Sequence, residues 1–148
     1  MIRTITFDFW NTLYITPRDK VLQNIRINGL LKVFDQAGHA FSYEEIYTVF
    51  VEIFKYVQRL QRSYGQEFPP EKQLEMILQR LNVPYSAEVW EQAWYYYCET
   101  LLEYPPRLND NVRETLPLLT ERYKLAVICN TGISPGSVLR KLMERDGI

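Results

Sequence analysis

The 148-residue chain is poor in the residues that mark several classes of protein. Its two cysteines, Cys98 and Cys129, lie far apart in sequence, and we interpret them as reduced thiols of a cytoplasmic protein. The single histidine, His39, follows a glycine at an expected helix end, where we predict a surface position and no metal site. Every apolar run is shorter than the about 18 residues that a membrane-spanning helix needs, so we expect no membrane partner.

An excess of charge of either sign is also absent, because 17 basic residues nearly balance 18 acidic ones. This balance gives no electrostatic signature of nucleic-acid binding, and we expect no nucleic-acid partner. A glycine-rich loop after the first apolar segment is missing as well, which argues against a dinucleotide-binding domain. By contrast, apolar residues make up 47% of the chain and aromatic residues 14%, which excludes a disordered or fibrous protein.

Two apolar segments predict strands, and a long helical zone separates them. IRTITFD, residues 2–8, is a β-branched segment that we predict to be the first strand. Helical spacing of apolar residues follows over residues 17–104, where Thr16, Ser42 and Ser86 are expected N-caps and Ser42 forms a capping box with Glu45. We interpret Arg26 and the other arginines of this zone as mainly solvated charge.

The last part of the chain returns to an alternation of helix and strand. A helix capped by Asn109 or Asp110 is predicted over residues 109–123, and KLAVICN, residues 124–130, resembles a strand buried in a parallel sheet. Ser134 and Pro135 then predict the start of a final helix. The expected fold is α/β: a Rossmann-like parallel-sheet core of residues 1–15 and 105–148, with a four-helix cap inserted at residues 16–104.

Polar side chains stand where both predicted strands end. Asp8 closes the first strand, and Asn130 and Thr131 close the second. Ligands of open parallel sheets bind outside the carboxyl ends of the strands, so these residues are expected to share a site. A carboxylate in that position can attack an electrophile as a covalent nucleophile, or it can bind a hard cation such as Mg²⁺. The residues alone leave both roles open.

The segments FDFWNTL and LAVICNTG, with a helical insertion between them, resemble the haloacid dehalogenase-like hydrolase superfamily. The resemblance extends over the whole chain and implies hydrolysis of a small-molecule substrate, either a phosphate ester or a halogenated acid. It implies that Asp8 is the nucleophile and that Asp8 and the Trp10 carbonyl would bind Mg²⁺ in a phosphatase. The other implied roles are catalytic for Thr12 and Asn130, and substrate-binding for Trp10, Asn11, Cys129, Thr131 and Gly132.

Two positions depart from the family pattern. Phosphatases of the family use an acidic residue two positions after the nucleophile as general acid and base, whereas this chain has Trp10, whose indole N–H only donates a hydrogen bond. Halide-displacing members need no such acid, because a halide leaves without a proton. Cys129 occupies the Ser/Thr position of the second motif, where a thiol is a weak hydrogen-bond donor. Trp10 is also consistent with simple packing under the cap, and Cys129 with a small buried apolar residue.

A third departure concerns the end of the given sequence at Ile148. Family members continue with a basic residue, an acidic loop and further strands, so we expect an incomplete core and little or no activity in this chain. The first strand would then have an open edge, through which a homodimer could form. The alternative function is that of a non-catalytic interaction module related to these hydrolases.

Overall fold

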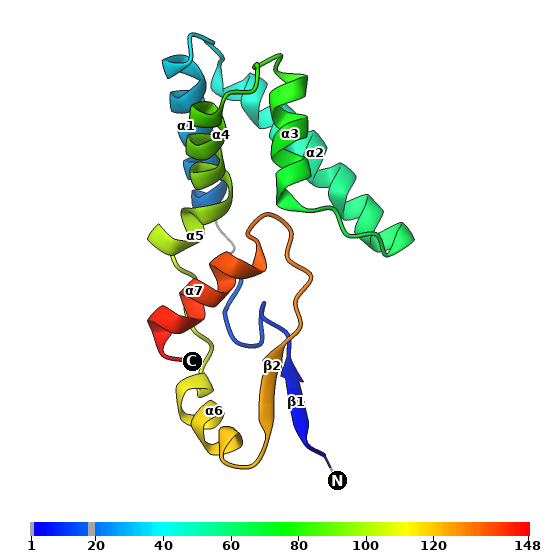
Figure 1. The fold of residues 1–148 in the computed structure, drawn as a ribbon, viewed down its shortest axis with the longest axis vertical. Helices are drawn as coiled ribbons and strands as arrows, with labels where there is room; N and C mark the ends of the chain where they lie inside the picture. Colours follow the sequence, from blue (N-terminus) through cyan, green and yellow to red (C-terminus); the bar gives the residue numbers. More distant parts are fainter. Residues whose placement is uncertain (1, 18–19) are drawn as a thin grey trace.

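The computed structural model describes residues 2–17 and 20–148, and Figure 1 shows their arrangement. Two strands form a parallel sheet in which Thr4 lies opposite Lys124 and Phe7 opposite Val127. This small parallel sheet with its helices confirms the predicted α/β class and its Rossmann-like core. In chain order the elements are β1 (Thr4–Phe7), α1 (Val21–Gln36), α2 (Tyr43–Tyr64), α3 (Pro70–Arg80), α4 (Ala87–Trp94), the π-helix η1 (Tyr95–Glu99), α5 (Thr100–Glu103), α6 (Val112–Thr120), β2 (Lys124–Val127) and α7 (Gly136–Asp146).

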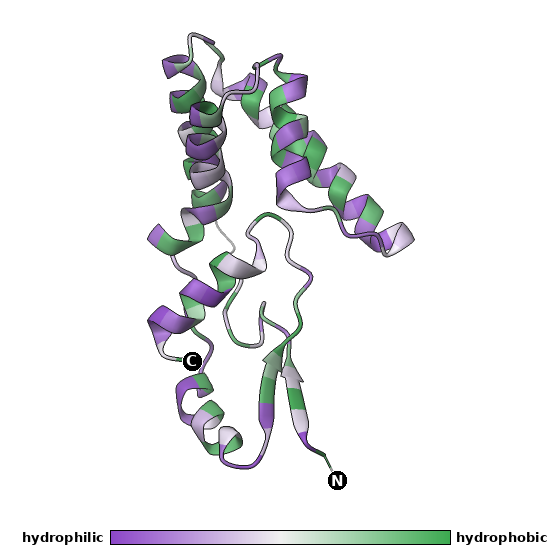
Figure 2. Ribbon diagram, in the orientation of Figure 1, coloured by the Kyte–Doolittle hydropathy of each residue, from purple (hydrophilic) through white to green (hydrophobic). Residues whose placement is uncertain are grey.

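The inserted helices pack around a hydrophobic cluster of their own. It is built from the inward faces of α1, α2 and α3 and from η1, and Figure 2 shows hydrophobic bands alternating with hydrophilic ones along these helices. Its fully buried members include Ile27, Leu30, Phe34, Ile46, Leu74, Ile77 and Cys98. At roughly 25 cal/mol per Å² of apolar surface, burial of these side chains is the main source of stability for the insertion.

A second hydrophobic cluster lies beneath the insertion, between the loop after β1 and helix α7. Its buried members are Phe9, Leu13, Tyr14, Leu101, Val112, Val138, Leu139 and Leu142. Leu101 belongs to α5 and is therefore the contribution of the insertion to the lower cluster. In the opposite direction, Ile133 reaches from the loop after β2 into the upper cluster. The two parts of the molecule are thus joined by apolar contacts on both sides.

Several local signals were predicted correctly. The Ser42 side chain accepts from the Glu45 N–H, and the Glu45 carboxylate accepts from the Ser42 N–H, which completes the capping box. Ser86 caps α4 by accepting from the Val89 N–H. Gly65 ends α2 in the left-handed conformation with φ 60°, which glycine adopts without steric cost.

Two other predicted helix starts were wrong. The first helix begins at Val21 without a side-chain cap, and Thr16 donates its N–H to Asn11 Oδ1; residues 18 and 19 of the predicted helix lie outside the described residues. Helix α6 begins after Asn111, because the side-chain amide of Asn109 donates a hydrogen bond to the Thr12 carbonyl. Residues 109–111 are thereby kept out of the helix.

Two further predictions concern the end of the sequence and need correction. Strand β2 covers Lys124–Val127 only, and it is largely exposed rather than buried, since it has a described neighbour on one edge alone. Ser134 does not cap α7, which begins after Pro135. The Ser134 hydroxyl is buried and donates to the Cys98 carbonyl, a contact with the inserted helices.

Candidate functional site

The ends of the two strands meet at one edge of the sheet. The Ile128 N–H donates to the Phe7 carbonyl at 2.9 Å, so the chains stay side by side past the last paired residues. Asp8 and Cys129 therefore follow neighbouring strands at the same level. The Asp8 side chain is exposed, and its Oδ1 accepts the Phe9 N–H at 2.7 Å. The carboxylate is therefore accessible from solvent.

Cys129 lies against the chain that carries Asp8. Burial raises the pKa of the Cys129 thiol, the Asp8 carboxylate raises it further, and hydrogen bonds from the backbone amides of Phe9 and Trp10 lower it. The net effect is a raised pKa, so the thiol stays protonated at neutral pH and is a poor nucleophile.

The loop after β1 is shaped by Asn11 rather than by Thr12. Asn11 adopts φ 59°, a left-handed conformation that asparagine tolerates better than most residues. Its N–H donates to the Tyr14 carbonyl at 2.6 Å, and its side-chain oxygen accepts the Thr16 N–H at 3.1 Å. The Thr12 side chain is exposed. Its backbone carbonyl accepts a hydrogen bond from the side-chain amide of Asn109. Asn11 thus positions the loop.

A cavity of about 440 Å³ separates the inserted helices from the strand ends. From the sheet side it is lined by Trp10, Asn130, Thr131 and Gly132, and from the insertion by Arg26, Phe54, Gln61 and Gln73, among others. A smaller cavity of about 210 Å³ adjoins it and is lined by Cys129, Asn130 and Gln61. The structure therefore brings five of the predicted site residues to these cavities. Asp8 stands beside them next to Cys129, whereas Asn11 and Thr12 do not line either one.

Arg26 lines the main cavity, a placement that the sequence did not give. It is only 9% exposed, so its interpretation as solvated charge was wrong. Its Nε donates to the Tyr97 carbonyl at 2.9 Å and its Nη2 to Ser134 Oγ at 3.3 Å. Burial lowers the pKa of the guanidinium, and electrostatic interactions with Tyr97 and Cys98 raise it. A signal for burial was present, because Arg26 shares the helix face of Leu30 and Val33.

The charge of Arg26 gives the cavity a preference for anions. No Asp or Glu among the described residues forms an ion pair with it. A buried cation without a counter-charge costs free energy, and an anion in the cavity would offset that cost. Guanidinium groups bind carboxylates through paired hydrogen bonds, which makes a small carboxylic acid a suitable occupant.

The Mg²⁺ ligands that are predicted at the strand ends are one carboxylate and one backbone carbonyl. The cation takes about six oxygen ligands, commonly including one or two carboxylates and several waters. Asp8 and the Trp10 carbonyl are the ligands that the sequence predicts there. Among residues 2–17 and 20–148, no group of three His, Cys, Asp or Glu side chains is placed to hold a metal ion. Metal binding by Asp8 and Trp10 stays a prediction.

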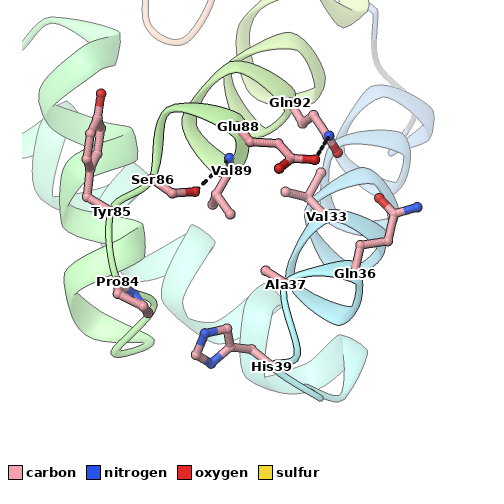
Figure 3. A pocket seen from close by; sticks show the side chains of 10 residues that line it. All are labelled: Val33, Gln36, Ala37, His39, Pro84, Tyr85, Ser86, Glu88, Val89 and Gln92. Carbon is pink, nitrogen blue, oxygen red and sulfur yellow. Dashed lines mark hydrogen bonds between the residues drawn. The ribbon is translucent and has the colours of Figure 1, made fainter.

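A further cavity of about 320 Å³ lies at the end of the insertion that is farthest from the sheet. Figure 3 shows its lining side chains, which include His39, after α1, and Glu88 and Gln92 of α4. His39 is half-buried, and its ring stacks on Phe41 with centroids 6.3 Å apart. Its distance from the strand ends separates this cavity from Asp8.

Comparisons with known proteins give a weak likeness of fold. No protein-family model and no curated protein matches the chain. A solved structure that resembles it is the L-2-haloacid dehalogenase from Xanthobacter autotrophicus, with a TM-score of 0.42 and 16% sequence identity. The match covers 99% of this chain and 53% of the dehalogenase, so the chain spans about half the length of that enzyme. Within the described residues, no helix is both long and apolar enough to cross a membrane.

Proposed function

We propose that this chain carries the nucleophile of a haloacid dehalogenase-like hydrolase and that its substrate is a small halogenated carboxylic acid. The observation that supports this most is Arg26, a buried cation without a described carboxylate partner beside the cavity at the strand ends. Trp10 favours halide displacement over phosphate transfer, because a halide leaves without the proton that an alkoxide requires. The exposed Asp8 carboxylate supplies the nucleophile.

The proposed first step is a displacement at carbon. A carboxylate oxygen of Asp8 forms a bond to the carbon that bears the halogen, and the halide leaves with the electrons of the broken bond. Arg26 holds the substrate carboxylate, which fixes the carbon near Asp8. In the second step water attacks the carbonyl carbon of the aspartyl ester. The hydroxy acid is released, the Asp8 carboxylate is regenerated and one proton passes to solvent.

The second step is expected to be slow in this chain. Attack by water is faster when a general base removes its proton. The described residues that line the main cavity include no carboxylate and no imidazole. The aspartyl ester should therefore accumulate, and the purified chain should show little turnover.

Covalent trapping tests this function. The chain is incubated with chloroacetate, and intact-mass and peptide mass spectrometry locate any carboxymethyl group. We expect an ester on Asp8, released by hydroxylamine, and no adduct in an Asp8→Asn variant. A hydroxylamine-resistant adduct would instead mark a thioether at Cys129.

The Arg26→Met variant should form the ester at least about tenfold more slowly, equivalent to 1.4 kcal/mol. The matched Arg59→Met variant changes an exposed arginine of α2 and should leave the rate unchanged.

Two outcomes would contradict the proposal. The first is that a chain shown by circular dichroism to be folded forms no adduct on Asp8. The second is that the adduct forms at a rate that does not depend on Arg26. Asp8-dependent hydrolysis of 4-nitrophenyl phosphate in the presence of Mg²⁺ would instead establish phosphatase chemistry. Absence of both reactions would favour the alternative of a non-catalytic interaction module. That alternative is supported by exposed apolar side chains at the end of β2, where Ile128 is 65% exposed.

A further inference from the structure

Helix η1 is a π-helical turn whose carbonyl groups accept hydrogen bonds from other parts of the chain. The Tyr97 carbonyl accepts from Arg26 Nε of α1 at 2.9 Å. The next carbonyl, that of Cys98, accepts from Ser134 Oγ at 3.0 Å. A π-helical turn uses backbone pairs five residues apart instead of four, and such turns are frequent at functional sites. Two adjacent peptide groups of η1 thus join α1 to the loop after β2.

A third hydrogen bond ties Arg26 and Ser134 to each other. Arg26 Nη2 donates to Ser134 Oγ at 3.3 Å. The single hydroxyl proton of Ser134 goes to the Cys98 carbonyl, so its oxygen can only accept from Arg26. Ser134 is 3% exposed, which leaves water little access to replace either partner. The three bonds therefore form a closed arrangement in which the hydroxyl has one orientation.

The two bonds that Arg26 donates use one edge of its guanidinium and leave another edge free. A guanidinium is planar and has five N–H groups, and those of Nε and Nη2 lie along one edge. Nη1 has no acceptor among the described residues, and no fully buried side-chain nitrogen of the described chain lacks one, so Nη1 is not enclosed by protein. Because Arg26 lines the main cavity, the edge of Nη1 and Nη2 is available to an occupant there.

We propose that Ser134 is a positioning residue for Arg26, with η1 as the frame to which both side chains are bonded. The inference rests on the proposed function, in which Arg26 holds the substrate carboxylate. A carboxylate binds a guanidinium best when its two oxygens meet two parallel N–H groups in one plane. Ser134 and the Tyr97 carbonyl fix that plane, so the free edge keeps the orientation that the carboxylate needs. Without the Ser134 hydroxyl, the guanidinium has the Tyr97 carbonyl as its one tether and can turn about it.

The relative rates with a charged and a neutral reagent test this role. Chloroacetate has the carboxylate that Arg26 would hold, whereas chloroacetamide is of similar size and has none. Peptide mass spectrometry follows ester formation on Asp8 with each reagent. The ratio of the two rates should fall at least about tenfold in Ser134→Ala, because a misplaced guanidinium slows the charged reagent alone. The ratio should stay unchanged in the matched Ser63→Ala variant, at an exposed position of α2.

A structural role of Ser134 would give a different result. If Ser134 only held the loop after β2 in place, its loss would slow both reagents equally and leave their ratio unchanged. That outcome would overturn the positioning role.

NMR spectroscopy of the unmodified chain tests the geometry without any reaction. A guanidinium tethered at Nε and Nη2 should rotate slowly about its Nε–Cζ bond, so its Nη protons should give separate signals. The Arg26→Lys variant identifies these signals by their loss, and in Ser134→Ala they should merge. Merged signals in the unmodified chain would overturn the positioning role, even if Asp8 forms the ester. Separate signals in a chain that forms no ester would contradict the proposed function alone, and Ser134 would then position Arg26 for a carboxylate that is bound without reaction.

Discussion

Tyr14 and Tyr97 are buried phenols, one in each hydrophobic cluster. Tyr14 donates its hydroxyl proton to Asp146 Oδ2 at 2.8 Å, and Tyr97 donates to Gln73 Oε1 at 2.9 Å. Burial is the main cause that raises the pKa of both phenols, and the bond to Asp146 raises that of Tyr14 further. Both hydroxyls therefore stay protonated in the folded chain over the pH range in which exposed phenols ionise.

These raised pKa values predict a loss of stability at alkaline pH. In the unfolded chain both phenols ionise from about pH 10, whereas in the folded chain they keep their protons. The folded state then binds more protons, so the free energy of unfolding falls as pH rises above about 10, by up to about 1.4 kcal/mol per pH unit for each phenol. Urea unfolding between pH 8 and roughly pH 11 measures this slope, and it should be shallower in Tyr14→Phe and Tyr97→Phe.

The matched control for this titration is Tyr64→Phe. Tyr64 is 74% exposed, so its substitution should leave the pH slope of the unmodified chain intact. Equal slopes in all four proteins would show that neither buried phenol controls alkaline unfolding.

At the scale of elements, the contact between α1 and η1 depends on the absence of a side chain. Gly29 lies in the middle of α1, and a Cβ atom at that position would collide with the ring of Tyr96. Helix η1 is a π-helical turn between α4 and α5, and it places Tyr97 and Cys98 in the upper cluster. These residues lie within the predicted helical zone, but the π-helical turn was not predicted.

Gly29→Ala is expected to destabilise the chain by about 1–3 kcal/mol, because Tyr96 must move to admit the methyl group. The matched variant is Gly136→Ala in α7, where a Cβ atom would have no neighbour within 4 Å. It should be neutral, or stabilising by up to about 1 kcal/mol through helix propensity. Chemical denaturation measures both values. The added Cβ atom would also lie 2.6 Å from the Cβ atom of Tyr96, which alanine keeps. In a double-mutant cycle, Tyr96→Gly should therefore relieve most of the cost of Gly29→Ala, and strictly additive effects would contradict the collision.

At the scale of the whole molecule, Gln73 links the inserted helices to the loop after β2. Its side chain is completely buried. Its Nε2 donates to the carbonyls of Phe68 at 3.0 Å and Gly132 at 2.7 Å, and its Oε1 accepts from Tyr97. Ser134 adds a second link through the Cys98 carbonyl. These bonds fix the wall of the main cavity, to which Gln73, Gly132 and Ser134 all contribute.

Gln73→Met keeps the size of the side chain but removes these hydrogen bonds. We expect a loss of about 2–4 kcal/mol in the free energy of unfolding, because buried partners are left unsatisfied. Hydrogen exchange should become faster in residues 129–134 and change little in α2. Gln79→Met, at an exposed position of α3, serves as the control. Unchanged exchange in residues 129–134 would show that the contacts of Ile133 and Ser134 hold the loop to the insertion without Gln73.

The sequence by itself determined the features that depend on neighbours along the chain. These include the capping box at Ser42, the helix end at Gly65, the α/β order of elements and the placement of Asp8 after a strand. Each depends on local backbone geometry or on the period of apolar residues, which a single sequence displays. The positions of Asn130, Thr131 and Gly132 near the strand ends could be predicted for the same reason.

Only the tertiary structure decided which polar side chains serve as local caps and which serve as distant links. Asn109, Ser134 and Gln73 bond to segments remote in sequence. For the buried Ser134 and Gln73, such a hydrogen bond outweighs a local cap that water could replace. The burial of Arg26 likewise depends on Tyr97 and Ser134, which lie 71 and 108 residues further along the chain. The charge that gives the cavity its preference for anions therefore comes from long-range packing, which no local pattern in the sequence displays.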